Sequence, residues 1–212
     1  MDVLVAGGHG KVARHLLRLL ARNGHTARGL IRNPDHAADL ESDGARPVLC
    51  DLERDDVRPH VGGADAIVFS AGAGPGSGAE RKRTVDLGGA LKCLEAAQEL
   101  GVAHFLIVSS MGTENAEHAG AMRPYLEAKR EADEAVRTSA LEWTIVRPGG
   151  LTDEPGTGRV DARPSLGRRG RIPRADVALV LYECVQAPES IHAQFEVLSG
   201  DTPVADAVRA LR

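Results

Sequence analysis

Aromatic residues are scarce in this sequence, at 3% of 212 residues. Stacking on nucleobases requires exposed aromatic rings, so their scarcity argues against a surface for single-stranded nucleic acid. The formal net charge of −4 also leaves no excess of basic groups to attract nucleic acid or an anionic membrane. We therefore expect neither of these as a partner, and a core built mainly from Ala, Val, Leu and Ile.

Cysteines and long apolar runs are scarce as well. The three cysteines, Cys50, Cys93 and Cys184, form no CxxC pair, which argues against a disulfide framework or a zinc site. The eight histidines show no metal-ligand spacing, so we predict no metal. No apolar run approaches the roughly 18 residues that span a bilayer. An apolar strand begins within two residues of the N-terminus and leaves no room for a secretory signal. These features predict a cytoplasmic protein and favour no particular oligomeric state.

What the sequence does contain is a regular alternation of short apolar runs and longer helical patterns. With 42% hydrophobic and 26% charged residues, the chain suits one α/β domain spanning residues 1–212. Apolar runs predict strands at residues 3–6, 27–31, 46–50, 66–69, 104–109, 143–147 and 194–198. Helical patterns lie at residues 11–22, from 33 onward, at 80–100, 123–139 and 174–187, and at the C-terminus. This alternation predicts a doubly wound, mostly parallel sheet with helices on both faces.

Three segments lack a regular pattern. Residues 72–78 are too glycine-rich for regular structure, and residues 111–121 are polar. Residues 150–174 contain several prolines and glycines and, between Arg159 and Arg174, six arginines. We expect these segments to form loops beside a small-molecule substrate, with one short strand in residues 150–174. The arginines suit an anionic substrate or a phosphate group, but a charge-balanced surface loop explains them equally well.

The most informative motif follows the first predicted strand. Gly7, Gly10 and Ala13 give the pattern GxxGxxA, in which glycine permits a tight turn and a close backbone approach to a pyrophosphate. The helix that begins at Lys11 and Val12 would offer free N–H groups to the phosphates, and His9 lies within the same turn. The motif predicts a Rossmann-type dinucleotide site. The alternative is a glycine turn that serves packing alone.

The residue after the second strand bears on which dinucleotide binds. An acidic side chain there accepts hydrogen bonds from the ribose 2′-hydroxyl and favours NAD. This sequence has Arg32 instead, whose guanidinium suits the 2′-phosphate of NADP. We therefore predict NADPH over NAD. The alternative is an exposed arginine at a helix start.

Two further strand ends suit the rest of the nucleotide. Asp51 could accept the adenine amino group while Leu52 packs on the ring, although an N-cap for residues 53 onward explains Asp51 equally well. Ser70, Ala71 and Gly72 end the fourth strand, where small residues leave space for a ribose.

A possible catalytic set follows the fifth strand. Ser110 lies at its end, and Tyr125 and Lys129 stand four residues apart, on one face of a predicted helix. An ammonium group close to a phenol favours the phenolate, so Tyr125 is suited to move a proton while Ser110 donates to a carbonyl oxygen. YxxxK is also common by chance, since a tyrosine can pack and a lysine can pair with a surface glutamate.

With these residues in place, the chain resembles the short-chain dehydrogenase/reductase superfamily, in its atypical, extended-like branch of small NAD(P)H-binding, epimerase/dehydratase-like proteins. The likeness runs along almost the whole chain, through VLVAGGHGKVARHLL, IRNP, CDLE, FSAGAG, IVSSMGT, YLEAK, TIVRPGGL, RADVA and FEVLSGDTP.

The resemblance implies a sheet of about seven strands with NADP across its carboxyl edge. It also implies that Ser110, Tyr125 and Lys129 are the catalytic residues, that Lys129 holds the nicotinamide ribose, and that Pro148 lies beside the nicotinamide. The family's helix asparagine, part of a proton relay, falls on Asp86. An ionised carboxylate cannot donate a hydrogen bond, so Asp86 departs from the pattern.

Three hypotheses follow. The first is an NADPH-dependent oxidoreductase or epimerase-like enzyme for a small carbonyl or alcohol substrate, acting through Ser110, Tyr125 and Lys129. The second is a non-catalytic NADP(H)-binding sensor or regulator, suggested by Asp86 and the short substrate segment. The third is a flavin or quinone reductase that needs no tyrosine.

Overall fold

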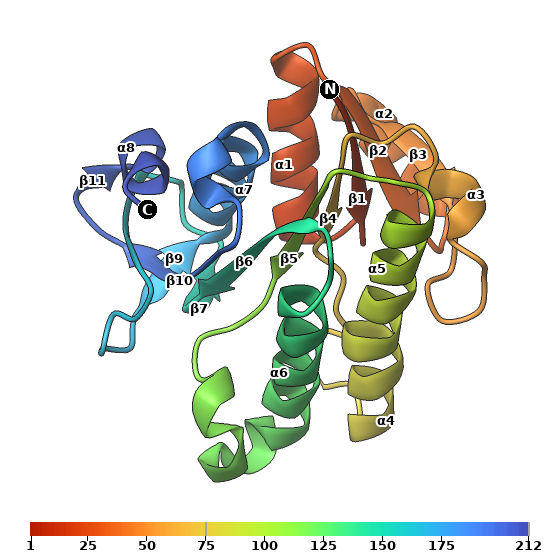
Figure 1. Ribbon diagram of the computed structural model, residues 1–212. Coiled ribbons are helices and arrows are strands. Elements are labelled where there is room, and N and C mark those ends of the chain that lie inside the picture. The colour runs from red at the N-terminus through yellow and green to blue at the C-terminus, as the bar shows by residue number, and fades with distance from the viewer. Residues whose placement is uncertain (75, 212) are drawn as a thin grey trace.

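The computed structural model describes residues 1–74 and 76–211, and Pro75, within the predicted glycine-rich loop, lies outside them. A nine-stranded sheet crosses the molecule (Figure 1). Seven of its strands are parallel, in the spatial order β3 (Arg46–Leu49), β2 (Thr26–Ile31), β1 (Asp2–Ala6), β4 (Ala66–Phe69), β5 (His104–Val108), β6 (Glu142–Pro148) and β10 (Ala193–Ser199). This is the doubly wound order, in which the strand sequence reverses direction between β1 and β4. The predicted fold class is confirmed.

Two antiparallel strands extend the sheet beyond β10. They are β8 (Arg159–Arg163), which pairs with β10, and β11 (Thr202–Pro203), which pairs with β8. A separate parallel pair joins β7 (Gly150–Thr152) to β9 (Arg171–Pro173). The expectation of one short strand in residues 150–174 is therefore wrong. These strands are short and bury at most two residues each, such as Val160 in β8 and Ile172 in β9, so the sequence shows no alternation.

Helices cover both faces of the sheet. One face carries α1 (Lys11–Arg22), α7 (Arg174–Gln186), α2 (Ala37–Ser42) and α8 (Val204–Arg209). The other carries α3 (Arg58–Val61), α5 (Gly89–Glu99) and α6 (Arg123–Arg137), and the short helix α4 (Ala79–Arg81) comes before α5 in the chain. Short helical turns connect these elements at η1 (Pro34–His36), η3 (Thr113–His118), η4 (Gly120–Met122) and η5 (Pro188–Ser190).

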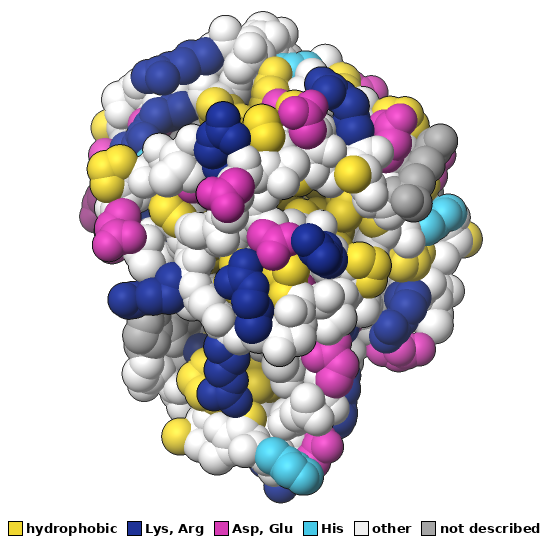
Figure 2. All heavy atoms as spheres, turned by 90° about the vertical axis from the view of Figure 1, so that its left-hand side faces the viewer, with side chains coloured by type: hydrophobic (Ala, Val, Ile, Leu, Met, Phe, Trp, Pro, Cys, Tyr) yellow, Lys and Arg dark blue, Asp and Glu magenta, His cyan; other side chains and the backbone are white. Residues whose placement is uncertain are grey.

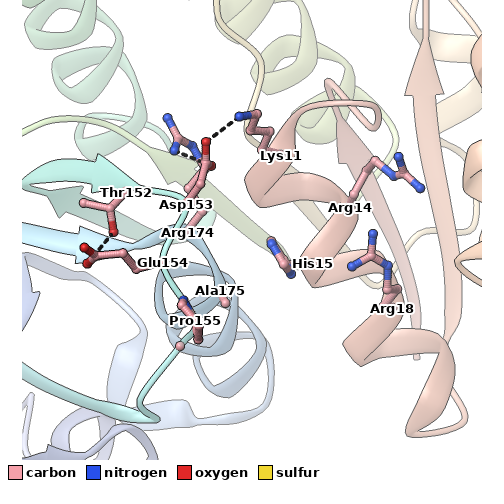
Figure 3. A pocket seen from close by; sticks show the side chains of 11 residues that line it. Lys11, Arg14, His15, Arg18, Thr152, Asp153, Glu154, Pro155, Arg174 and Ala175 are labelled. Carbon is pink, nitrogen blue, oxygen red and sulfur yellow. Dashed lines mark hydrogen bonds and ion pairs between the residues drawn. The ribbon is translucent and has the colours of Figure 1, made fainter.

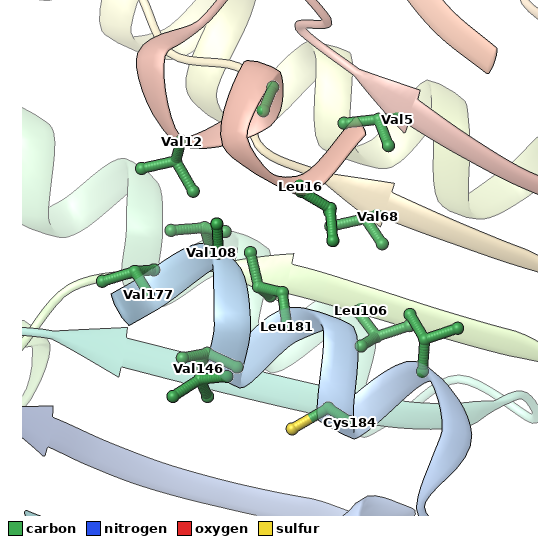
Figure 4. Packing of buried hydrophobic residues seen from close by; sticks show 14 of the residues in the cluster. Val5, Val12, Leu16, Val68, Leu106, Val108, Val146, Val177, Leu181 and Cys184 are labelled. Atoms are coloured by element: carbon green, nitrogen blue, oxygen red, sulfur yellow. The ribbon is translucent and has the colours of Figure 1, made fainter. Parts of the chain in front are cut away.

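The strands alternate their side chains between two cores. In β1, Val3 and Val5 face the core under α1 and α7, whereas Leu4 and Ala6 face the core under α5 and α6. Figure 4 shows Val5 near Leu16 of α1, and shows α7 packed on the same layer. Because both faces of the parallel strands are buried, they appear in the sequence as nearly continuous apolar runs.

One helix differs from the prediction in its winding. The segment expected as a single α-helix over residues 80–100 consists of α4, a π-helical segment η2 (Lys82–Gly88) and α5. A π-helix bonds each N–H one residue farther back than an α-helix does. Asp86 lies within this π-helical segment and is buried.

Candidate cofactor and catalytic site

The turn between β1 and α1 is built for close backbone contact. Gly7 has φ +80°, and a Cβ there would lie 2.6 Å from Cα of Ala71, after β4. A Cβ on Gly8 would lie 2.8 Å from Cα of Gly29 in β2. Gly10 donates from its N–H to the Gly7 carbonyl at 2.8 Å and closes the turn. Neither Gly7 nor Gly8 could therefore carry a side chain without backbone movement.

The helix behind this turn presents an uncapped N-terminus. Gly10 is its N-cap residue, and among the described residues no side chain caps the first turn and no acidic residue stands in it. Free N–H groups and the helix dipole favour an anion at such an end. A turn that excludes Cβ atoms, followed by an open helix start, fits a pyrophosphate.

The side chains around this turn have protein partners. His9 contacts the Asp39 carboxylate through Nε2 at 2.7 Å and stacks on His36 with 3.5 Å between ring centroids. Lys11 donates to Asp153 at 2.5 Å, and Val12 is buried against the core between α1 and α7. Val12 can therefore meet a phosphate only through its backbone.

A hollow of about 420 Å³ runs along the flank of α1 (Figure 3). Lys11 and Arg174 converge there on Asp153, at 2.5 Å and 2.7 Å. The hydrogen bond from Lys11, helped by Arg174, holds the pKa of the Asp153 carboxyl below its usual value. This ion-paired group ties the start of α1 to the segment after β7. Neither Ser110 nor Tyr125 lines the hollow.

The adenosine side of the predicted site lies at the ends of β2, β3 and β4. Arg32 is exposed, and its guanidinium lies 3.8 Å from Glu53. Asp51 accepts from the Glu53 N–H at 3.0 Å and so caps a turn, whereas the next helix begins only at Arg58. Leu52 is buried beneath α5.

The ends of β4 and β6 place small or rigid residues at the same edge of the sheet. Ser70 donates from its N–H to the Ala6 carbonyl at 3.0 Å. Ala71 lies against Gly7, and Gly72 lies close to Asp86, since a Cβ on Gly72 would be 3.1 Å from Asp86 Oδ1. Pro148 is buried and accepts from the Met111 N–H at 3.1 Å.

The predicted catalytic residues lie on one side of the sheet's carboxyl edge. Tyr125 stands in the first turn of α6, and Lys129 stands one turn later with its Nζ 5.8 Å from the Tyr125 ring centroid. Lys82 lies over the same ring at 5.2 Å, a neighbour that the sequence reasoning missed. Ser110 follows β5 and donates from its hydroxyl to the Met111 carbonyl at 3.1 Å.

Lys129 is the most enclosed of these groups. Its side chain is 4% exposed, and Nζ donates to the Val108 carbonyl at 3.0 Å and lies 3.6 Å from Asp86 Oδ1. The other Asp86 oxygen accepts from the Ala73 N–H at 3.0 Å, so Asp86 joins the lysine to the loop after β4.

A buried ionic network behind the site was also missed. Asp133, one turn beyond Lys129 on α6, accepts from Arg147 Nε at 2.9 Å and from the Ser109 hydroxyl at 2.8 Å. Arg147 also pairs with Glu114 in η3. Desolvation raises the pKa of Asp133 above its usual value. The i, i+4 spacing of Lys129 and Asp133 was the only available sequence signal.

Among the six arginines of residues 159–174, Arg163, Arg168 and Arg174 form ion pairs with aspartates. Arg163 and Arg168 both bind Asp161, at 3.1 Å and 3.0 Å, and Arg159 donates to the Asp201 carbonyl. Figure 2 shows acidic and basic side chains interspersed over the face that includes this part of the molecule. The charge-balanced interpretation of this segment fits these pairs.

Comparison with known proteins shows which family the chain resembles. A family model for NAD(P)H-binding proteins matches residues 7–188. The sugar epimerase YhfK of Bacillus subtilis, whose name marks it as uncharacterized, is 38% identical over 215 residues that span both chains fully.

Two solved structures match along nearly the whole chain. One, from Bacillus halodurans and described as a candidate NAD-dependent epimerase/dehydratase, is 42% identical with a TM-score of 0.96 and full coverage of both chains. The oxidoreductase ylbE of Lactococcus lactis is 26% identical with a TM-score of 0.87, covering 100% of this chain and 96% of that one. By its motif, its turn geometry and these relatives, the chain belongs to the NAD(P)H-binding family and has the Rossmann-like fold of epimerase- and oxidoreductase-type relatives.

Proposed function

We propose that this protein is an NADPH-dependent oxidoreductase or epimerase-like enzyme that acts on a small carbonyl or alcohol substrate. The observation that carries the proposal is the placement of Tyr125 within 5.8 Å of the Lys129 ammonium, on the helix that follows Ser110. Relatives named as an epimerase and as an oxidoreductase support this class of chemistry.

The residues present fit a nicotinamide dinucleotide. The turn at Gly7 and Gly8, which a Cβ would obstruct, and the uncapped start of α1 suit the pyrophosphate. Arg32, exposed at the end of β2, suits a 2′-phosphate, which favours NADPH over NADH. Replacing Arg32 with Ala is expected to weaken NADPH selectively, and an equal loss for NADH would remove this preference.

In carbonyl reduction, bound NADPH supplies the hydride that forms the new C–H bond. Ser110 donates a hydrogen bond to the carbonyl oxygen and orients it. Tyr125 gives its phenolic proton to that oxygen as the C=O π electrons become the O–H bond. The Lys129 ammonium then stabilises the phenolate left on Tyr125. Oxidation of an alcohol reverses each of these transfers.

A non-catalytic NADP(H)-binding regulator is the second candidate. It is favoured by the engagement of Lys129 with Asp86 and the Val108 carbonyl, which directs the ammonium to protein groups rather than to a ribose.

A cytoplasmic location stays a prediction. No helix in the described residues is long and apolar enough to cross a membrane, and several relatives are named as chloroplastic.

The two tyrosines of the chain allow a matched test. NADPH oxidation is followed with panels of carbonyl compounds, flavins and quinones for the wild type, Tyr125→Phe and Tyr182→Phe, where Tyr182 lies on α7 beside His25. The enzyme proposal expects Tyr125→Phe alone to abolish carbonyl turnover while NADPH still binds. Unchanged oxidation with a flavin or quinone would indicate the third hypothesis, and tight binding without any turnover would indicate the regulator.

A further inference from the structure

The Glu53 carboxylate accepts two hydrogen bonds from the helix after β4 and lies near a second guanidinium group, from the end of β2. Thr84 Oγ1 donates to Glu53 Oε1 at 2.6 Å, and Arg81 donates from a terminal guanidinium nitrogen to Oε2 at 3.0 Å. A terminal nitrogen of Arg32 lies 3.8 Å from the same Oε2. Glu53 follows β3, Arg32 follows β2, and the other two lie on the helix after β4. All four therefore meet at the carboxyl edge of the sheet.

The charges at this point do not balance. Two guanidinium groups face one carboxylate, and within the described residues Glu53 is the only carboxylate that pairs with either of them. The hydrogen bond from Thr84 and the one from Arg81 hold the pKa of Glu53 below its usual value, so the group stays an anion at neutral pH. Two arginines and a hydroxyl around one anion are also what a phosphate monoester would need, because guanidinium groups match phosphate oxygens in geometry and charge.

We propose that Arg81 joins Arg32 in recognising the cofactor's 2′-phosphate, and that the Glu53 carboxylate is an internal competitor that this phosphate displaces. The inference rests on the proposed function, since it requires that the protein binds NADPH.

The surroundings of Glu53 allow its side chain to move while its backbone stays in place. Lys92 Nζ donates to the Leu52 carbonyl at 2.9 Å and to the Glu53 carbonyl at 3.2 Å, which anchors the turn. The Glu53 side chain is 25% exposed, and Arg81 and Arg32 are more exposed still, so all three have an open path to solvent. NADH carries a hydroxyl where NADPH carries the phosphate, and a neutral hydroxyl does not compete with a carboxylate for two guanidinium groups.

The test is calorimetric binding of four ligands to the full chain. The ligands form two pairs, 2′,5′-ADP with 5′-AMP and NADPH with NADH. The two members of each pair differ only in the 2′-phosphate. The variants are Arg81→Gln and Glu53→Gln, with Arg58→Gln as the control. Arg58 is an arginine of similar exposure that pairs with Asp56 at 2.9 Å, away from the four groups described above. Gln at position 53 can still accept from Thr84 while losing the charge.

We expect Arg81→Gln to weaken 2′,5′-ADP and NADPH about tenfold, the scale of one partly exposed charged hydrogen bond, with 5′-AMP and NADH within twofold. Glu53→Gln is expected to tighten the two 2′-phosphorylated ligands several-fold and leave the others unchanged. Arg58→Gln changes none of the four. An unchanged affinity for 5′-AMP shows that each variant is folded.

Equal losses for all four ligands in Arg81→Gln, or no tightening in Glu53→Gln, would overturn the inference. If 2′-phosphate selectivity depends on Arg32 alone, the inference fails while the proposed function stands. If the wild type binds none of the four ligands, both fail.

Discussion

The Asp86 carboxylate and the Lys129 ammonium form a buried ion pair, with 3.6 Å between Oδ1 and Nζ and both side chains at most 4% exposed. Oδ1 accepts no hydrogen bond within the described residues, so the ammonium is its compensating group. The pair lies between the π-helical segment and α6, beside the ring of Tyr125. An aspartate where the resembled family has an asparagine therefore has a structural partner of its own.

Loss of this pair gives the first prediction. Asp86→Ala leaves the Lys129 ammonium buried without a counter-ion, which costs about 3–5 kcal/mol in the free energy of unfolding. The double variant Asp86→Ala/Lys129→Met removes both charges and is expected to recover much of that loss. Urea unfolding of the two variants measures both effects. If Asp86→Ala lowers the free energy of unfolding by less than about 1 kcal/mol, the buried pair contributes no more than an exposed ion pair does.

The turn between β1 and α1 gives a second prediction, with a matched control in the same chain. Gly7 and Gly24 have nearly the same φ, +80° and +79°, but a Cβ at Gly24 would meet nothing within 4 Å. Gly24→Ala is expected to cost about 1–2 kcal/mol for the left-handed backbone alone. Gly7→Ala adds the clash with Ala71, for roughly 1–3 kcal/mol more. Equal losses in the free energy of unfolding for the two variants, measured with urea, would mean that Ala71 shifts away from the new Cβ at little cost.

A third prediction concerns pH. Burial lowers the pKa of His104 to about 4, and Nε2 lies 2.8 Å from the Thr144 hydroxyl. The unfolded chain, with an ordinary histidine pKa near 6.5, binds this proton more readily, so stability is lost as the pH falls from about 6.5 toward 4. The loss from this group reaches about 3 kcal/mol.

The measurement for this prediction is urea unfolding at pH 7 and pH 5. His104→Gln should lower stability at pH 7 and reduce the drop between the two pH values, whereas His118→Gln, at an exposed histidine, should leave the drop unchanged. A drop of the same size in His104→Gln would place its origin in other groups.

The network behind the site gives a fourth prediction. Glu114 is half-exposed and connects η3 to the buried pair of Arg147 and Asp133. Glu114→Gln is expected to change overall stability by less than about 1 kcal/mol but to speed hydrogen exchange of the amides in η3. Glu117→Gln, which removes an exposed pair with Arg130, is the control. Equal exchange in both variants would show that Arg147 does not hold this segment.

The seven parallel strands of the main sheet and the first helix followed from the sequence to within a residue or so, because buried parallel strands are short apolar runs and α1 places Leu16 and Leu20 at helical spacing. The π-helical segment could not be predicted from the sequence, since apolar spacing does not reveal where the hydrogen bonds of a helix lengthen by one residue. The strands β8, β9 and β11 bury too few side chains to show a period.

At the candidate site, the sequence pointed to single residues but not to the partners that the structure gives them. The turn at Gly7–Gly10 was predictable because its glycines are close together in the chain. Glu53 and Arg81 are 28 positions apart and meet only because β3 and β4 end at the same edge of the sheet. The Asp133–Arg147 pair was hidden for the same reason, since its two residues come from α6 and β6.

The central claim is that the turn at Gly7–Gly10 receives a nicotinamide dinucleotide, and titration of the purified wild-type protein with NADPH and NADH tests it most directly. The account predicts saturable binding of one nucleotide per chain, tighter for NADPH. Failure of both nucleotides to bind at millimolar concentration would contradict it.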